Sequence, residues 1–130
     1  MRERTWGRGA LIGGMLMVAL GLSPLTASAH HGWGGYVDQL SDITGIVETP
    51  LSLAGPHASL KVKTADGHVW NVLLAPPAGT ERAGLKDGMI PAGANVVVHG
   101  QRHRDPKVFE IKTTRLTWNG KTYNVYPDRQ

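Results

Sequence analysis

The sequence has 130 residues, no cysteine and a net charge of +4 at neutral pH. This length predicts one domain, and the absence of thiols excludes disulfides, c-type haem attachment and cysteine-ligated zinc or iron–sulfur sites. Half of the net charge lies within residues 1–29, which hold three arginines and one glutamate. The rest of the chain is therefore too weakly basic to indicate a nucleic-acid partner.

Residues 1–29 have the three zones of a cleavable signal peptide. An arginine-containing stretch precedes the uncharged residues 10–22, and Pro24 and the small residues 27–29 follow. The uncharged stretch is too short for a bilayer-spanning helix, which needs about 20 apolar residues. We predict cleavage after this segment, which leaves His30 as the first residue of a periplasmic or secreted protein without a membrane span. An uncleaved membrane anchor is the alternative.

Beyond the signal peptide, apolar and polar residues alternate as they do in β-strands. Asp66-Gly67 and Asn119-Gly120 are typical of two-residue hairpin turns, in which both positions take positive φ. A short helix is predicted at 80–85, with Thr80 as its N-cap. Strands are predicted at 42–49, 57–64, 68–74, 95–102, 108–118 and 122–126.

The order of three strands, one short helix and further strands is that of an OB-type barrel. We therefore expect a mainly β protein in which residues 42–130 form a small OB-like barrel of five to six strands. A Gly- and aromatic-rich N-terminal arm at 30–41 precedes it. A small β-sandwich is the alternative architecture.

The pair His30-His31 stands at the predicted cleavage point. A free N-terminal histidine chelates a metal through its α-amine and Nδ1, and another imidazole provides a third nitrogen. Alternatively, the α-amine, the amide nitrogen of His31 and the imidazole of His31 chelate together. Such nitrogen sets suit Cu(II), which favours tetragonal coordination. The ligands must be deprotonated, so binding should weaken as the pH falls through the histidine range. A solvated terminus without a metal is the alternative.

A third histidine, His57, completes the candidate copper site. Pro56 fixes its own φ and so places His57 reproducibly at the start of the second predicted strand. In an OB-type order this position follows the loop between the first two strands, where such barrels bind ligands. Residues 32–42 span at most about 36–40 Å when extended, so His30 and His31 are within reach. The alternative is that His57 is an ordinary surface residue.

Two aromatic residues of the arm, Trp33 and Tyr36, are predicted to anchor it to the barrel and are candidate ligand contacts. The argument is that two large rings would otherwise be exposed; a disordered leader is the alternative. The remaining histidines are expected to be half-exposed strand residues: His68, His99 and His103.

No nucleophile elbow, P-loop, HExxH sequence or dinucleotide fingerprint is present. We therefore expect a non-enzymatic periplasmic binding module for a metal ion or small ligand, with copper as the candidate metal. The alternative is a metal-independent envelope or stress module that binds a small ligand, peptide or glycan. A copper oxidoreductase is the third interpretation.

Several short motifs stand in a fixed order along the chain: His30-His31-Gly32-Trp33, Thr44-Gly45-Ile46-Val47, Pro56-His57, Gly67-His68-Val69-Trp70, Arg82-Ala83-Gly84-Leu85, Gly100 and Gly120-Lys121-Thr122-Tyr123. With these motifs the chain resembles a group of small exported bacterial proteins that share a domain of unknown function. The resemblance implies a periplasmic OB-like barrel and no established activity. Members of that group commonly have Asn-Pro-His after an aromatic residue, whereas this chain has Leu53-Ala54-Gly55-Pro56-His57.

Overall fold

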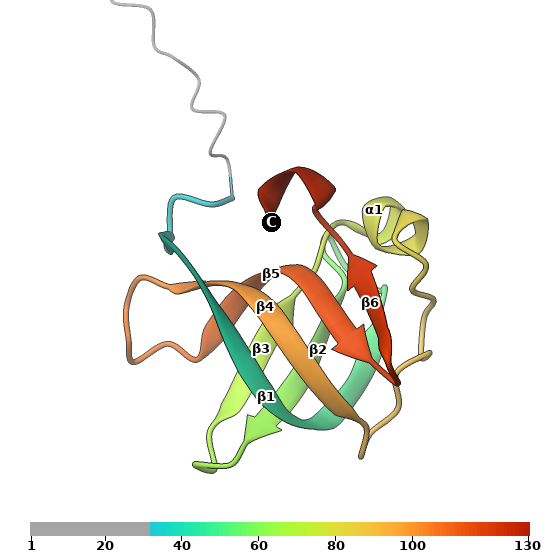
Figure 1. The fold of residues 1–130 in the computed structure, drawn as a ribbon, viewed down its shortest axis with the longest axis horizontal. Coiled ribbons are helices and arrows are strands. Elements are labelled where there is room, and N and C mark those ends of the chain that lie inside the picture. The colour runs from blue at the N-terminus through green and yellow to red at the C-terminus, as the bar shows by residue number, and fades with distance from the viewer. Residues whose placement is uncertain (1–31) are drawn as a thin grey trace, which may run out of the picture.

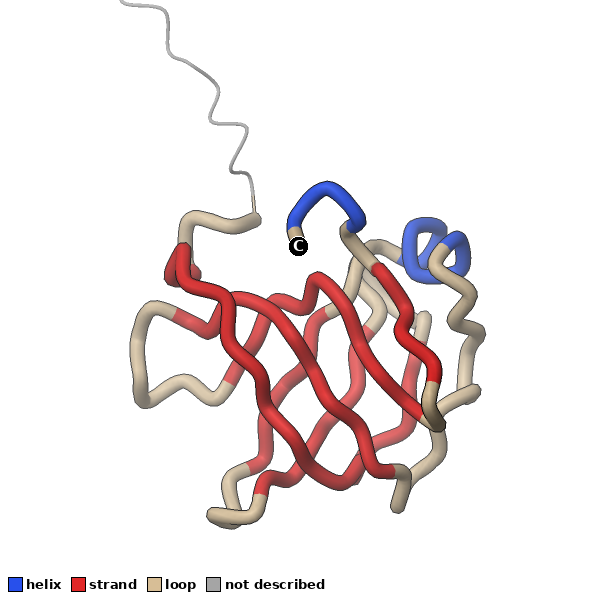
Figure 2. Tube along the Cα trace, in the orientation of Figure 1, coloured by secondary structure: helices blue, strands red, loops and turns tan. Residues whose placement is uncertain are grey.

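The structure is a computed structural model and describes residues 32–130. The predicted signal peptide and the pair His30-His31 lie outside these residues. Residues 32–130 form six strands, one short helix and one 3-10 turn, as expected for a mainly β fold, and Figures 1 and 2 show how these elements are arranged. The elements are β1 (Tyr36–Ser52), β2 (Ser59–Thr64), β3 (Val69–Leu73), α1 (Pro77–Arg82), β4 (Asn95–His103), β5 (Glu110–Trp118), β6 (Lys121–Asn124) and the 3-10 turn η1 (Pro127–Arg129).

Five of the strands pair into a closed ring. β1 pairs with β2 and β4, β2 with β3, and β4 with β5, all antiparallel. A parallel pairing of β3 with β5, from Asn71 opposite Glu110 to Leu73 opposite Lys112, closes the ring. β6 adds to the free side of β5. This arrangement, with α1 between β3 and β4, confirms the OB-like order predicted from the sequence.

The core lies inside the ring and follows the predicted alternation. Every second residue of β2 and β3 is buried, while the lysines of β2 face outward. Apolar residues that face into the ring are at most 8 % exposed: Ile43, Val47, Ala58, Leu60, Val62, Trp70, Val72, Leu74, Val96, Val98 and Ile111. Alternation fails in β5, where four consecutive residues, 111–114, are buried, and in β1, where the three consecutive residues 48–50 are exposed.

Two glycines allow the strands to approach closely where the ring bends. A Cβ at Gly45 would overlap the carbonyl oxygen of Lys63, and one at Gly100 would overlap the carbonyl oxygen of Lys112. The register of β4 against β5 also shifts between His99 and Gly100, which indicates a β-bulge. Glycine at these positions therefore serves strand packing rather than a turn.

Three local predictions need correction. β1 begins at Tyr36, six residues before the predicted start, because the arm pairs with β4 through Tyr36 opposite His103. The helix spans Pro77–Arg82, so Thr80 is not its N-cap; proline is favoured in the first helical turn because it has no N–H to leave unpaired. Thr80 is buried, and its hydroxyl donates to the carbonyl oxygen of Ala75 at 2.9 Å.

The two predicted hairpin turns also differ from one another. Asn119 and Gly120 both take positive φ, as a type I′ turn requires. In the β2–β3 turn only Gly67 does so, and the amide of Gly67 donates to the carbonyl oxygen of Thr64. The carboxylate of Asp66 accepts hydrogen bonds from the Thr64 hydroxyl and the His68 amide instead. This turn is therefore longer than the predicted two residues.

None of the helices within residues 32–130 is long and apolar enough to cross a membrane.

Candidate functional site

The segment before β1 is fixed to the barrel by a buried tryptophan. Trp33 is 9 % exposed, and its ring centroid lies 5.1 Å from that of Tyr126 in an edge-on arrangement. Two cations contact the same indole: the Lys112 Nζ lies 4.7 Å and the Arg129 Cζ 4.4 Å from its centroid. Cation–π contacts of this kind contribute about 0.5–2 kcal/mol each. The indole therefore joins the arm to β5 and to η1.

Lys112 is the central residue of this anchor and is only 4 % exposed. Its ammonium donates a hydrogen bond to the carbonyl oxygen of Gly32 at 2.6 Å. Burial and the neighbouring charge of Arg129 lower the pKa of Lys112, and Glu110 acts in the opposite direction. From the alternation of residues in β5, Lys112 would be expected to point outward into solvent. Instead, the arm lies over the Lys112 side chain and buries it. The sequence features that could have indicated this contact are a lysine at an outward position of a strand and a Gly- and aromatic-rich arm able to cover it.

Tyr36 makes the second anchor. Its hydroxyl donates to a carboxylate oxygen of Glu110 at 2.5 Å, and the Asn71 side chain donates to the other oxygen at 2.9 Å. Burial and the Glu110 carboxylate raise the pKa of the Tyr36 phenol far above its ordinary value of 10.0. The ring also contacts the imidazole of His103 edge-on, with 5.7 Å between centroids. Both candidate ligand contacts, Trp33 and Tyr36, thus bury their rings against the barrel.

His57 is half-buried and lies in the loop between β1 and β2, two residues before β2 begins at Ser59, and not at the start of a strand as predicted. Its Nδ1 lies 2.9 Å from the carbonyl oxygen of Leu74. A carbonyl only accepts hydrogen bonds, so Nδ1 carries the proton and Nε2 of the neutral ring keeps its lone pair. Metal-binding histidines commonly hold this tautomer through such a bond. The structure does not describe His30 and His31, and among residues 32–130 no group of three or more His, Asp or Glu residues could hold a metal ion.

The other histidines make local contacts. The His68 ring stacks on Phe109 with 4.0 Å between centroids, and its Nδ1 lies 3.0 Å from the Asp66 carboxylate. His103 accepts a hydrogen bond from the amide of Asp105. These contacts stabilise turns, as is usual for strand-end histidines.

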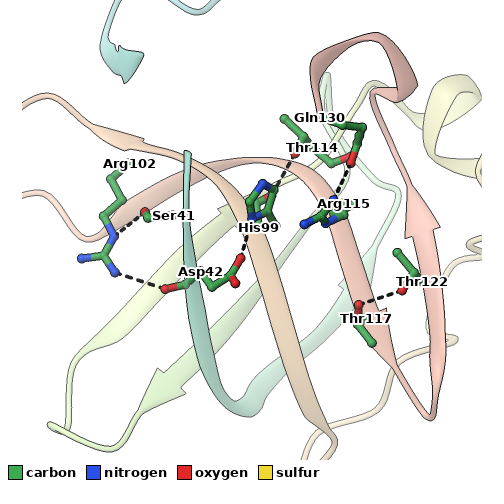
Figure 3. A network of polar contacts seen from close by, with 9 residues as sticks. All are labelled: Ser41, Asp42, His99, Arg102, Thr114, Arg115, Thr117, Thr122 and Gln130. Carbon is green, nitrogen blue, oxygen red and sulfur yellow. Dashed lines mark hydrogen bonds and ion pairs between the residues drawn. The ribbon is translucent and has the colours of Figure 1, made fainter. Parts of the chain in front are cut away.

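His99 belongs to a polar network on the outer face of β1, β4 and β5, drawn in Figure 3. Its Nδ1 lies 2.5 Å from the carboxylate of Asp42, the residue directly opposite on β1. Arg102 donates to the Ser41 hydroxyl at 3.0 Å and to the Asp42 carbonyl oxygen at 3.3 Å. Cross-strand pairs of this type fix strand register and contribute about 0.2–1 kcal/mol each. Stabilisation of the strand pairing is therefore sufficient to explain this network.

A cavity of about 430 Å³ lies between α1 and η1. In Figure 1 these two elements and residues 32–35 occupy one end of the barrel, opposite the β2–β3 turn. One wall of this cavity includes Ala75, whose neighbour Leu74 accepts the hydrogen bond from His57. The other wall includes Arg129, which packs on Trp33. His57 and the anchored arm are thus connected to the same end of the molecule.

Comparison with known proteins gives a likeness of fold only. No protein-family model and no curated protein matches the chain. The structure is similar to that of the ZRD-deleted mutant of TiaS in complex with agmatine, with a TM-score of 0.52, 13 % identity and coverage of 71 % of this chain and 28 % of that one. For apo TiaS (tRNAIle2 agmatidine synthetase) the TM-score is 0.47 and the identity 15 %, over 62 % of this chain and 18 % of that one. The chain thus spans less than a third of these proteins, and the likeness reflects a shared type of β fold.

Proposed function

We propose that this protein is an exported periplasmic binding module that chelates Cu(II) with His30, His31 and His57. After signal-peptide cleavage, the α-amine and imidazole of His30 provide two nitrogens of the chelate. The imidazole of His31 adds a third nitrogen, and Nε2 of His57 completes the set. In the alternative mode, the α-amine binds together with the amide nitrogen and the imidazole of His31, and Nε2 of His57 is again the fourth donor. Four nitrogens in a plane are the coordination that Cu(II) prefers.

The anchoring of Gly32 and Trp33 supports this proposal more than any other observation. These residues directly follow His31, and Lys112 and Arg129 hold them against the barrel. Two residues span no more than about 7 Å, so the chelate would stay close to the barrel end at which the arm is fixed. A fixed position reduces the entropy lost when a terminal chelate closes onto a side chain of the fold.

The state of His57 is also suitable. Its Nδ1 proton is engaged by Leu74, which orients the ring and leaves Nε2 as the donor atom. The charges of Lys112 and Arg129 reduce the affinity of this end for a simple cation. Copper binding must therefore come from the chelate itself, and displacement of the amide proton of His31 would lower the charge of the bound ion.

The test is a Cu(II) titration of the processed protein, purified after export with His30 as its verified first residue. A second protein carries the two additional residues Ala-Pro before His30, which convert the α-amine of His30 into an amide, and the proline has no N–H through which the new terminus could chelate the metal. We expect the extension to weaken binding at least tenfold and to shift the visible absorption band. His57→Ala should weaken binding as well, whereas His68→Ala, at the opposite end of the barrel, should not. Equal affinities and unchanged spectra for the native and extended proteins would refute the chelate.

A further inference from the structure

The cavity between α1 and η1 shares Arg129 with the anchor of the arm, but none of the proposed copper ligands lines it. One wall is formed by Ala75, Pro76, Gly79 and Arg82, and the other by residues 125–129. Its volume of about 430 Å³ lies within the range of small-molecule sites, about 300–1,000 Å³. A ligand of one or two rings would therefore fit it.

Positive charge gathers at this cavity without full compensation. Arg82 and Arg129 both line it, and Asp128 is the one carboxylate among the lining residues. Within residues 32–130, no ion pair joins Asp128 to either arginine. Lys112 adds a third cation next to Arg129, since both contact the ring of Trp33. Like charges held together in this way attract an anion.

The indole of Trp33 also restricts Arg129. The guanidinium lies 4.4 Å from the ring centroid, and Arg129 is only partly exposed. An arginine already held in one place loses less side-chain entropy when it binds a ligand. Burial together with the Arg129 charge lowers the pKa of Lys112, which is consistent with a positive potential at this end.

The remaining walls are apolar. Val125 is buried, Tyr126 is half-buried, and Pro76 and Pro127 contribute ring carbons on either side. Ligand sites combine such apolar surface with a few polar groups that fix orientation. Here the polar groups are two guanidinium forks, which match the geometry of carboxylates, sulfonates and phosphates.

We propose that this cavity binds a small organic anion with an apolar body, and that the anionic group pairs with Arg82 and Arg129. The apolar part lies against Tyr126 and the prolines. Binding needs no metal and does not depend on how the chain begins.

The test compares two fluorescent probes in EDTA, so that copper takes no part. 8-Anilinonaphthalene-1-sulfonate has an apolar body and a sulfonate, and N-phenyl-1-naphthylamine has the same body without the charge. We expect saturable binding of the sulfonate at one site per molecule and at least tenfold weaker binding of the neutral probe. Equal affinity for both probes would overturn the proposal, because the site would then recognise apolar surface alone.

Three variants locate the site. Arg82→Gln and Arg129→Gln should each raise the dissociation constant of the sulfonate about tenfold, as expected for loss of a charge-assisted hydrogen bond. Arg102→Gln is the matched control, since Arg102 also lies over an indole, 5.0 Å from the ring centroid of Trp70, but does not line this cavity. No effect of the first two substitutions, or an equal effect of all three, would overturn the assignment. Either result would leave the copper titration unaffected, so the two proposals fail separately.

Discussion

The ammonium of Lys112 donates to the carbonyl oxygen of Gly32 over 2.6 Å, and this contact joins residues 80 positions apart. The lysine reaches from β5 to a segment that has no strand partner of its own before Tyr36. Trp33 then covers the ammonium from the other side. A cation buried in this way is stable only while the carbonyl oxygen and the rings replace its lost hydration.

Replacing Lys112 with methionine should release the arm. The substitution keeps the length and apolar stem of the side chain but removes the hydrogen bond to Gly32 and the cation–π contact with Trp33. Because hydrogen bonds to charged groups contribute about 1.5–3 kcal/mol, we expect a loss of about 1–3 kcal/mol in the free energy of unfolding. Urea denaturation measures this loss, and a red shift of tryptophan fluorescence would report exposure of Trp33.

Lys63→Met is the control for that experiment. Lys63 is an exposed lysine whose Nζ lies 3.8 Å from the Glu48 carboxylate. Surface pairs of this type contribute at most about 1 kcal/mol, so this variant should keep nearly the stability and the full fluorescence spectrum of the original protein. If Lys112→Met behaved in the same way, the anchor would not depend on the ammonium.

Tyr36→Phe should change how stability depends on alkaline pH. In the folded protein the phenol pKa is raised by burial and by Glu110, whereas in the unfolded chain it is 10.0. Above pH 10 the unfolded chain releases this proton and the folded protein retains it, so stability present below pH 10 is lost as the pH rises. The loss approaches about 1.4 kcal/mol per pH unit for one such group.

The measurement is urea denaturation at pH 7 and at several values between 9.5 and 11. Tyr36→Phe should cost about 1–2 kcal/mol at pH 7, because the Glu110 carboxylate loses a donor, and should flatten the alkaline decline. Because Lys112 is present in both proteins, the difference between their two curves of stability against pH comes from the Tyr36 phenol. Parallel pH curves for the two proteins would mean that Tyr36 ionises as readily in the folded state as in the unfolded one.

Gly100→Ala should disrupt the pairing of β4 with β5. The added methyl group would overlap the Lys112 carbonyl oxygen and approach the Thr113 Cα, and backbone atoms cannot move aside as a flexible side chain can. We expect a loss of about 2–4 kcal/mol or failure to fold, the range for severe overpacking. Gly34→Ala is the control, since no atom lies within 4 Å of its added Cβ. Thermal unfolding compares them, and equal melting temperatures would contradict the close approach.

Thr113→Val should stabilise the protein or leave it unchanged. The Thr113 hydroxyl is fully buried and has no hydrogen-bond partner among residues 32–130. Valine has nearly the same shape and removes the cost of an unpaired polar group, about 1–3 kcal/mol. The neighbouring Thr114 is equally buried, but its hydroxyl donates to the His99 carbonyl oxygen at 3.2 Å. Thr114→Val should therefore destabilise the protein by about 1 kcal/mol, and the same sign of change in both variants would contradict this account.

The fold could be predicted because its strands are short, regular and separated by turn residues. The alternation of apolar and polar residues predicts the inward face of β2 and β3 residue by residue. The short helix is likewise found between the third and fourth strands, as predicted. The start of β1 could not be predicted, since Tyr36 to Ser41 pair through backbone atoms with β4, far away in sequence. The helix start was missed because Pro77 provides a first turn without any side-chain cap.

The site was predictable only in part. The sequence indicated that aromatic residues anchor the arm, but it did not indicate what they contact. Lys112 stands at an outward position of an alternating strand, and its burial depends on a segment 80 residues away folding back over it. The cavity between α1 and η1 is likewise formed by segments that no local pattern connects, residues 75–82 and 125–129.

The parallel pairing of β3 with β5 determines when the ring of strands can close during synthesis. This pairing joins residues 71–73 to residues 110–112, and β4 also has β5 as one of its two neighbours. A chain that has emerged only as far as residue 105 holds β1 to β4 as an open sheet with two unpaired sides. Contacts of such large sequence separation form late and slowly. The ring of a growing chain therefore stays open, with β3 and β4 as its unpaired edges, until β5 is complete.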